Sequence, residues 1–464
     1  MHVIDLGLVV VYLLMLLIMG IRHRLSQSTS VTDLIVGGRR LTLPALVASL
    51  VATWYGGILG VGEYSYLYGL SNWLVFGLPY YLAALIFAVF LAKRARRTQL
   101  LTIPDQLAHV YGRKTAGLGA VFIFLMTVPG AYVLMLGVLA EQLFGLPFSV
   151  GVIGGAIFSV GYVYLGGFRA VVRTDLIQFV LMFTGFIVML VILVSRYGGF
   201  EYLSENLPAT HLTWHGGNSG WYIATWYVIA LATLVEPTFY QRCYAAVNEA
   251  TARRGILVSI CCWTLFDFLT TTCGLYARVL LPDLADPVSS YPALALQVLP
   301  VGLLGLFVLA LLSTVMSTVD SYSFVAASTF GRDIMQTFFK VDESKVTRFT
   351  RLGLLLSTAL SVLVALCFRS VVDIWHFFGS IGTPALLVPL LSTFSKRRPM
   401  RPSTAMYSMI SCAIVSTVWY LTKYTNAAGD YWFSIEPIFP GLILSILIYI
   451  TATRNRSPVL PQND

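Results

Sequence analysis

Runs of roughly 20 apolar residues recur along nearly the whole chain, and this repetition limits its possible folds more than any other feature. The hydrocarbon core of a bilayer is about 30 Å thick, so a helix of about 20 apolar residues spans it. Only 11% of the 464 residues are charged, whereas soluble domains carry about 25%. No stretch is long and polar enough to fold as a separate soluble domain. The sequence therefore predicts a single membrane transport domain over residues 1–464.

The apolar runs predict an all-α integral membrane protein with about thirteen transmembrane helices. The first run lacks a preceding basic region and a following small-residue cleavage site, so we expect it to be retained as a helix. The ninth run is longer than one crossing needs, and we expect its cytoplasmic end to project beyond the membrane. The predicted spans are 3–21, 44–70, 72–92, 116–143, 147–165, 173–195, 219–240, 255–281, 292–330, 350–368, 371–393, 402–422 and 433–453.

The distribution of basic residues tests this count, because Lys and Arg collect in cytoplasmic loops. With the N-terminus outside and the spans alternating, 26 of the 30 Lys and Arg residues, Arg242 among them, fall on the inside. The outside segments hold only Arg196, Arg278, Arg369 and Lys423. The split predicts a cell (inner) membrane protein with an outer N-terminus and a cytoplasmic C-terminus. Cytoplasmic loops beside anionic lipid account for the net charge of +9, so we expect no nucleic-acid partner.

Two predicted helices contain residues that interrupt a helix. The second span contains Ala52-Thr53-Trp54-Tyr55-Gly56-Gly57, and the seventh contains Glu236-Pro237. Glycine and proline allow a helix to unwind, and the freed carbonyls can bind a cation. The two interruptions lie five spans apart, which is the spacing expected for two inverted five-helix repeats that meet at a binding site.

The ninth span carries a face of hydroxyl groups. Its residues Thr314, Ser317, Thr318 and Ser321 recur at intervals of three and four, and Asp320 lies among them. Hydroxyls on one face can bind a partly dehydrated Na⁺, although they can also join helices by hydrogen bonds. Asp320 in the same run favours an ion site.

Four motifs together resemble the sodium/solute symporter family, which includes the bacterial proline and pantothenate permeases and the choline transporter. They run from about residue 33 to 335 in the family's order and spacing. They are Val36-Gly37-Gly38-Arg39; Gly166-Gly167-Phe168-Arg169-Ala170-Val171 with Thr174-Asp175 and Gln178; Gln241-Arg242 with Ala245-Ala246; and Met316-Ser317-Thr318 through Arg332-Asp333.

The resemblance implies a LeuT-type core of two inverted five-helix repeats. Carried onto this chain, the repeats cover about 44–195 and 219–393, and the extra helices are 3–21, 402–422 and 433–453. The resemblance also implies Na⁺ as the coupling ion, bound by carbonyls of the first broken helix and by oxygen atoms of the ninth span. The matching residues are Ala52, Tyr55, Thr314, Ser317 and Thr318.

Some family members bind a second cation, and the matching residues here include the aspartate of the Thr-Asp pair. They are Asp175, Ser317, Asp320 and Ser321. Asp320 replaces a serine of some relatives. It could tighten a second sodium, bind a proton, or pair with a nearby arginine such as Arg173.

The solute is expected between the two breaks near the midplane, where its predicted contacts are Trp54, Glu236, Phe239 and Tyr240. Trp54, Ile58 and Leu59 stand where sugar-transporting relatives carry amides and acids, so a sugar is disfavoured. The segment around Trp54 resembles that of the choline transporter, in which an aromatic ring holds a cation. An amino acid, a choline-like amine and a carboxylate all remain open. No role is assigned to Asp267 or His376.

These features predict a sodium-coupled symporter that imports a small organic solute by alternating access. A proton-coupled carrier of the same fold is the alternative, and a solute sensor built on a symporter core is a further one. The sequence contains no phosphate-binding G-x-x-x-x-G-K loop and no nucleophile and base arrangement, so we expect no enzyme activity. It indicates no obligatory protein partner.

Overall fold

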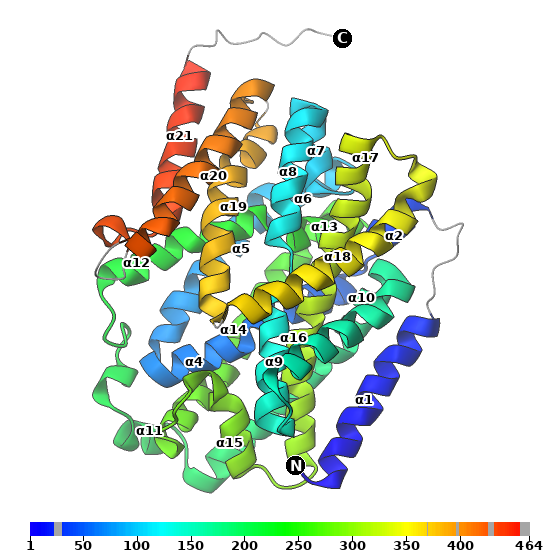
Figure 1. Ribbon diagram of the computed structural model, residues 1–464. Helices are drawn as coiled ribbons and strands as arrows, with labels where there is room; N and C mark the ends of the chain where they lie inside the picture. Colours follow the sequence, from blue (N-terminus) through cyan, green and yellow to red (C-terminus); the bar gives the residue numbers. More distant parts are fainter. Residues whose placement is uncertain (23–29, 369, 396–398, 426–430, 455–464) are drawn as a thin grey trace.

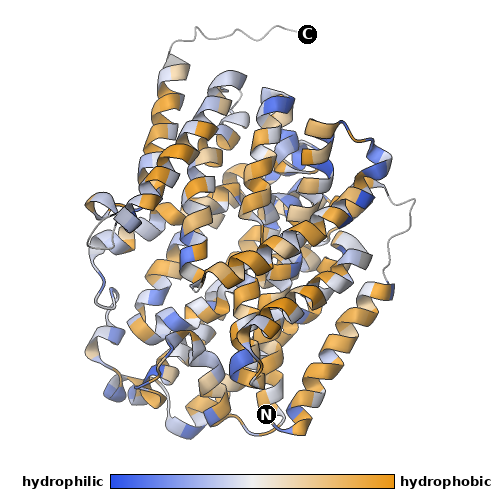
Figure 2. Ribbon diagram, viewed as in Figure 1, coloured by the Kyte–Doolittle hydropathy of each residue, from blue (hydrophilic) through white to orange (hydrophobic). Residues whose placement is uncertain are grey.

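The computed structural model describes residues 1–22, 30–368, 370–395, 399–425 and 431–454. Within these ranges the regular structure is helical, apart from one isolated β-bridge between Leu41 and Ala246. Figure 1 shows long helices running between two ends of the molecule, with the start of α1 (Val3–Arg22) at one end and the final turns of α21 (Ile438–Arg454) at the other. Figure 2 shows hydrophobic residues along most of the length of these helices, with hydrophilic residues mostly toward the two ends.

Eleven helical units of the described chain are long and apolar enough to cross a bilayer. Each of the thirteen ranges predicted from the sequence overlaps one of these units or one of two shorter apolar helices, Phe148–Tyr164 and Ile438–Ala452. The eleven units are Val3–Arg22, Leu43–Tyr68, Trp73–Arg97, Arg113–Phe144, Gly166–Tyr197, Gly220–Ala245, Glu249–Leu280, Leu303–Phe339, Glu343–Cys367, Asp373–Thr393 and Pro402–Thr425.

The helices of these units carry the labels of Figure 1. They are α5 (Leu78–Ile86), α6 (Ala92–Arg97), α8 (Arg113–Met126), α9 (Gly130–Phe144), α10 (Phe148–Tyr197), α14 (Glu249–Leu280), α18 (Val346–Cys367), α19 (Val371–Thr393) and α20 (Pro402–Thr425), besides those described below. Three short helices lie in connecting segments: α2 (Val31–Val36), α7 (Ile103–Tyr111) and α11 (Phe200–Asn206).

Both predicted helix interruptions are present. The second unit consists of α3 (Leu43–Trp54), a 3₁₀ turn over Tyr55–Gly57 and α4 (Ile58–Tyr68). A Cβ atom on Gly56 would collide with the Thr318 side chain, so only glycine allows this close approach. The seventh unit consists of α12 (Gly220–Ile229), a 3₁₀ segment over Ala230–Val235 and α13 (Pro237–Ala245).

Glu236 separates the two helical parts of the seventh unit. Its backbone is extended (φ −66°, ψ 114°), and its side chain caps α13 by accepting from the Thr238 backbone N–H at 3.3 Å. Pro237 occupies the first position of α13, where its missing N–H costs no helical hydrogen bond.

The ninth predicted span is divided differently from the expectation. Residues 290–298 form a separate helix, α15 (Ser290–Val298), and the crossing helix α16 (Leu303–Ser328) begins only after Gly302, whose φ is +88°. A π-helical segment over Thr329–Ile334 and α17 (Met335–Phe339) prolong α16 at its other end. The prediction of one continuous unit over 292–330 was therefore wrong, because Pro300 and Gly302 end one helix before the next begins.

The helix α16 lies at the centre of the bundle, and almost every residue along it is buried. It packs against α10, α3, α9 and α18. The extra helix α1 is fixed to its start by Asp5, whose Oδ1 accepts from the backbone N–H groups of Gly302 (2.7 Å) and Gly305 (2.8 Å). A carboxylate is favourable there because the first N–H groups of a helix have no partners inside the helix.

The predicted fifth and sixth spans are continuous in α10 and are separated by a sharp kink at Gly167 (φ 60°, ψ −158°). This backbone conformation is accessible to glycine and costly for other residues. The Gly166-Gly167 motif therefore marks the kink between the two helical parts of α10.

Candidate functional site

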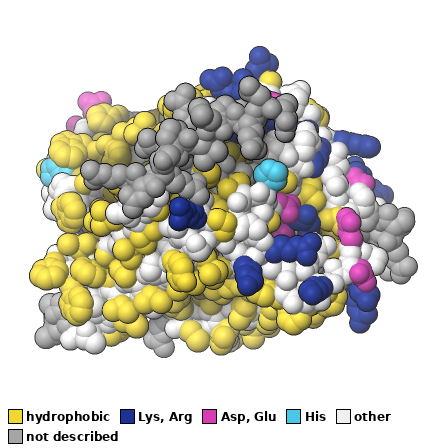
Figure 3. Space-filling view, turned by 90° about the horizontal axis from the view of Figure 1, so that it is seen from above, with side chains coloured by type: hydrophobic (Ala, Val, Ile, Leu, Met, Phe, Trp, Pro, Cys, Tyr) yellow, Lys and Arg dark blue, Asp and Glu magenta, His cyan; other side chains and the backbone are white. Residues whose placement is uncertain are grey.

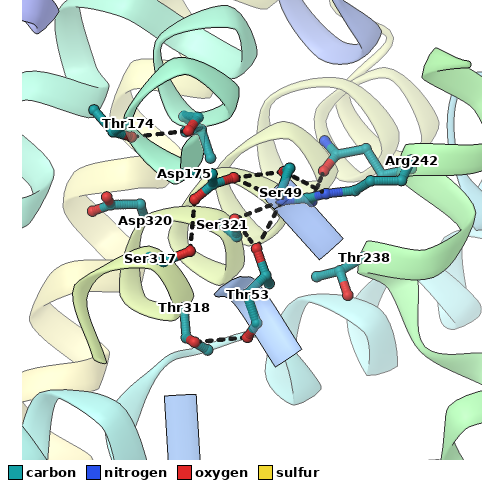
Figure 4. A network of polar contacts seen from close by, with 12 residues as sticks. Ser49, Thr53, Thr174, Asp175, Thr238, Arg242, Ser317, Thr318, Asp320 and Ser321 are labelled. Atoms are coloured by element: carbon teal, nitrogen blue, oxygen red, sulfur yellow. Dashed lines mark hydrogen bonds and ion pairs between the residues drawn. The ribbon is translucent and has the colours of Figure 1, made fainter. Parts of the chain in front are cut away.

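The hydroxyl face of α16 meets the interrupted helix α3–α4, as Figure 4 shows. The Thr318 hydroxyl donates to the backbone carbonyl of Thr53 at 2.7 Å, close to the end of α3. The Ser317 hydroxyl donates to Oδ1 of Asp175, on α10, at 2.6 Å. All four residues are buried, so three helices meet here through oxygen atoms that water does not reach.

The predicted sodium ligands occupy both sides of this contact. Ala52 lies in the last turn of α3, and Tyr55 begins the 3₁₀ turn, where the change in helix type shifts the hydrogen-bond register of the carbonyls. The Thr314 hydroxyl donates to the Ala310 carbonyl at 2.7 Å. Thr314 therefore presents its own carbonyl to the cluster, where the Thr318 hydroxyl approaches it at 3.4 Å. The atoms available as metal ligands are all oxygen atoms, which suits a hard cation such as Na⁺.

Asp175 is the anionic centre of a buried network. Its Oδ2 accepts from Ser49 at 2.5 Å and lies 3.6 Å from Nη2 of Arg242, which comes from α13. The same guanidinium donates to the hydroxyls of Ser321 (2.7 Å) and Thr53 (3.0 Å). Arg242 thus connects the second interrupted helix to the first and to α16.

Arg242 belongs to this buried network, although the sequence analysis did not include it among the site residues. The charge count places it among the cytoplasmic residues, but its side chain is only 1% exposed. The side chain extends from α13 toward Asp175 instead of toward water. Its position only six residues after the Glu236-Pro237 break was the available signal, because a buried charge needs a partner.

Asp320 and Ser321 of the predicted second cation site lie on different sides of α16. Ser321 joins the Asp175 network through Arg242 and Thr53. The Asp320 side chain points away from Asp175 in Figure 4, and its Oδ2 accepts from the Tyr162 hydroxyl of α10. Within the described residues its Oδ1 has no hydrogen-bond partner. The structure brings Asp175, Ser317 and Ser321 together and directs Asp320 elsewhere.

A cavity of about 220 Å³ lies next to the α3–α4 interruption. Eight of its nineteen described lining residues are aromatic, and they come from several helices, with Tyr80 on α5, Tyr132 on α9 and Tyr322 on α16. Trp375 of α19 closes over the interruption, where a Cβ atom on Gly57 would collide with its ring. The cavity is therefore rich in aromatic side chains and is bounded on one side by the 3₁₀ turn.

The four predicted solute contacts divide into two groups. Trp54 and Glu236 line the cavity. Phe239 is fully buried and packs edge-on against Trp54, with 5.0 Å between ring centroids, so it supports that indole from behind. The Tyr240 hydroxyl donates to the Leu234 carbonyl at 3.0 Å, and its side chain lines a separate cavity of about 20 Å³.

The remaining titratable residues of interest are Asp267 and His376. Asp267, on α14, lines the central cavity and accepts from the hydroxyls of Tyr55 and Tyr81. His376 packs against Trp226 and has its Nδ1 atom 3.6 Å from Glu436, away from the cavity lining. Asp267 therefore belongs to the candidate site, although its sequence context of apolar neighbours gave no indication of its partners.

Comparison with known proteins shows to which family the chain belongs. The model of the Sodium:solute symporter family matches residues 34–412, most of the chain. The chain belongs to the sodium:solute symporter family. This symporter is 25% identical to the sodium/pantothenate symporter of Haemophilus influenzae, with 91% of this chain and 90% of that protein covered. It is 26% identical to the osmoregulated proline transporter OpuE of Bacillus subtilis, with 96% and 93% covered.

A solved structure of a Na⁺-coupled sialic acid symporter has the same fold as this symporter, with a TM-score of 0.83 at 16% identity and coverage of 100% and 99%. The expected all-α LeuT-type architecture is therefore confirmed. The family membership also confirms sodium-coupled symport of a small solute across a membrane. The family and these neighbours are transporters.

Proposed function

We propose that this symporter takes up a small organic solute that carries a positively charged amine, and that the central cavity binds this amine through Trp54 and Glu236. One observation carries the proposal: the interruption of α3–α4 borders both the cavity and the hydroxyl face of α16. Tyr55 and Gly57 line the cavity, and the nearby Thr53 carbonyl accepts from Thr318. An ion bound on one side of this turn can thus influence a solute bound on the other side.

The proposed sodium site consists of the carbonyls of Ala52 and Tyr55 and of the α16 residues Thr314, Ser317 and Thr318. Sodium would hold the 3₁₀ turn against α16, because unwound carbonyls and hydroxyls supply oxygen ligands from both elements. The predicted second cation site includes Asp175 and Ser321. The Arg242 guanidinium already supplies positive charge beside Asp175. This favours one sodium ion for each solute molecule.

A proton is the second candidate for a coupling ion, and Asp320 is the observation that favours it. This carboxylate is 1% exposed, and one of its oxygen atoms has no partner within the described residues. A buried carboxylate without a cation is costly when it is ionised, so a proton on Asp320 would remove that cost.

The proposed function is tested by measuring uptake of radiolabelled solutes into proteoliposomes. The solutes screened are amino acids, choline-like amines and carboxylates. Uptake of an amine-bearing solute should require an inward Na⁺ gradient and should fall strongly in Glu236→Gln. The binding of Na⁺ without solute should remain nearly unchanged in that variant, because Glu236 is outside the proposed sodium site. Wild-type solute affinity in Glu236→Gln would contradict a solute contact at this residue.

Trp54 provides an independent arm of the same experiment. Trp54→Phe should weaken uptake less than Trp54→Ala, because phenylalanine keeps part of the aromatic face. If the two variants lose solute affinity equally, the proposed attraction between the ring and the amine is wrong.

We also propose that the N-terminus lies outside and that the end of the molecule near the C-terminus is cytoplasmic. Figure 3 views this end, and Lys and Arg side chains gather over part of it. The segments 94–114 and 243–254 are proposed to be cytoplasmic together with 396–401, and 197–218 is proposed to be outside. Of these residues 396–398, like Arg369, lie outside the described part of the chain.

Cysteine labelling tests this orientation. In a variant without the native cysteines, a cysteine at Lys114 should react with an impermeant maleimide only after the membrane is opened. A cysteine at Glu205 should react in intact cells. External labelling at Lys114 would reverse the proposed orientation.

A further inference from the structure

The central cavity contains two carboxylates and, among its described lining residues, no Lys, Arg or His. Glu236 enters from the break before α13, and Asp267 enters from α14. The ion pairs of the described residues include neither of them. The charge of the cavity wall therefore comes from acids alone.

Neutral groups solvate both carboxylates without neutralising them. Asp267 accepts one hydroxyl on each oxygen, from Tyr55 and from Tyr81. Glu236 accepts from the Thr238 N–H at 3.3 Å and from the Thr238 hydroxyl at 3.1 Å. Such hydrogen bonds lower the cost of burying an anion, but a buried negative charge still requires a cation or a proton.

The rest of the wall also favours positive charge. The faces of aromatic rings carry negative electrostatic potential and attract ammonium groups. The one buried hydrogen-bond donor of the lining that has no partner within the described residues is the indole N–H of Trp375. This N–H and the phenol groups of the lining tyrosines are neutral donors, which suit a hydroxyl or a carbonyl oxygen. A carboxylate buried beside Glu236 and Asp267 would be repelled.

We infer that the solute is an organic cation without a carboxylate, in the chemical class of amino alcohols and quaternary amines, and that Asp267 is a further solute-binding residue. This inference rests on the proposed function and narrows it. It separates this chain from the relatives whose names specify pantothenate and proline, since both of those molecules carry a carboxylate.

Matched pairs of probes test the inference in the wild-type protein. Choline and glycine betaine share a trimethylammonium group, and betaine carries a carboxylate where choline carries a hydroxymethyl group. Prolinamide and proline form a second pair, in which an amide stands in place of the carboxylate. Binding at fixed Na⁺ is measured by tryptophan fluorescence, and uptake is measured in proteoliposomes. The cation of at least one pair should bind at least tenfold more tightly than its carboxylate partner and should show Na⁺-dependent uptake.

The possible outcomes separate this inference from the proposed function. If the zwitterion binds as tightly as its cation in both pairs, the inference is overturned, although sodium-coupled uptake of an amine through Trp54 and Glu236 stands. If neither the cations nor the zwitterions are bound or taken up with Na⁺, while a carboxylate such as pantothenate is, both proposals fail. If no probe in the panel binds, both proposals fail as well.

Substitutions test the role of Asp267. Asp267→Asn should weaken cation binding tenfold or more and should reduce the difference between cation and zwitterion, because the repulsion of the carboxylate decreases. Asp267→Glu keeps the charge and should keep the cation preference, which a purely structural role would not require. Glu141→Gln removes an exposed carboxylate of α9 and should change neither quantity. If folded Asp267→Asn keeps the wild-type preference for the cation over the zwitterion, Asp267 is not a solute-binding residue. If that variant does not fold, the matched probes in the wild-type protein still decide whether the solute is a cation without a carboxylate.

Discussion

Replacing Arg242 by methionine is expected to destabilise the folded symporter by about 3–5 kcal/mol. The substitution leaves Asp175 without its cation in a site that water does not reach, and it also leaves three hydroxyl groups without their shared donor. Thermal unfolding of the purified protein in detergent, followed by tryptophan fluorescence, measures the effect. We expect a large fall in the unfolding temperature or a loss of folded protein.

A second substitution distinguishes the lost ion pair from lost packing. Arg242→Met combined with Asp175→Asn removes the uncompensated charge, so it should recover a substantial part of the lost stability. Arg254→Met, at an exposed arginine of α14, should have little effect. Wild-type stability of Arg242→Met alone would show that Asp175 does not need the guanidinium.

Removing either hydroxyl that joins α16 to its neighbours should raise the Na⁺ concentration for half-maximal uptake tenfold or more. A tenfold change corresponds to about 1.4 kcal/mol of binding free energy. Ser317→Ala and Thr318→Ala each delete one proposed oxygen ligand, while alanine is well tolerated in a membrane helix. The measurement is initial uptake as a function of Na⁺ concentration at saturating solute.

Two controls accompany this experiment. Thr318→Ser keeps the hydroxyl and should stay close to the wild type. Thr272→Ala removes an exposed hydroxyl that donates only to its own helix, at the Phe268 carbonyl, and should leave the Na⁺ dependence unchanged. Unaltered Na⁺ dependence in both Ser317→Ala and Thr318→Ala would show that sodium binds elsewhere.

The positions of the helices and of both interruptions could be predicted from the sequence, because they depend on local properties. A membrane-spanning helix needs its own run of apolar residues, and the breaks need Gly56-Gly57 or Pro237 at the point where the chain deviates. The division of 292–330 into α15 and α16 was missed, although Pro300 and Gly302 marked it, because apolar residues continue on both sides.

The directions of the side chains could not be predicted, because they depend on how each helix is rotated against its neighbours. Adjacent residues of an α-helix differ by about 100° in direction. Asp320 and Ser321 consequently face different partners, and so do Phe239 and Tyr240. The partners of Asp267 are Tyr55 and Tyr81, about two hundred residues earlier in the chain, and no local pattern connects them.

The two adjacent glycines of the 3₁₀ turn have opposite neighbours: Gly56 lies against the Thr318 side chain, and Gly57 lies against the Trp375 ring. One peptide unit therefore separates a proposed sodium ligand from a wall of the solute cavity. If sodium draws this peptide toward α16, the same displacement changes the space that is left beside Trp375. Thermodynamic reciprocity then requires that sodium raise the affinity for solute by the same factor by which solute raises the affinity for sodium.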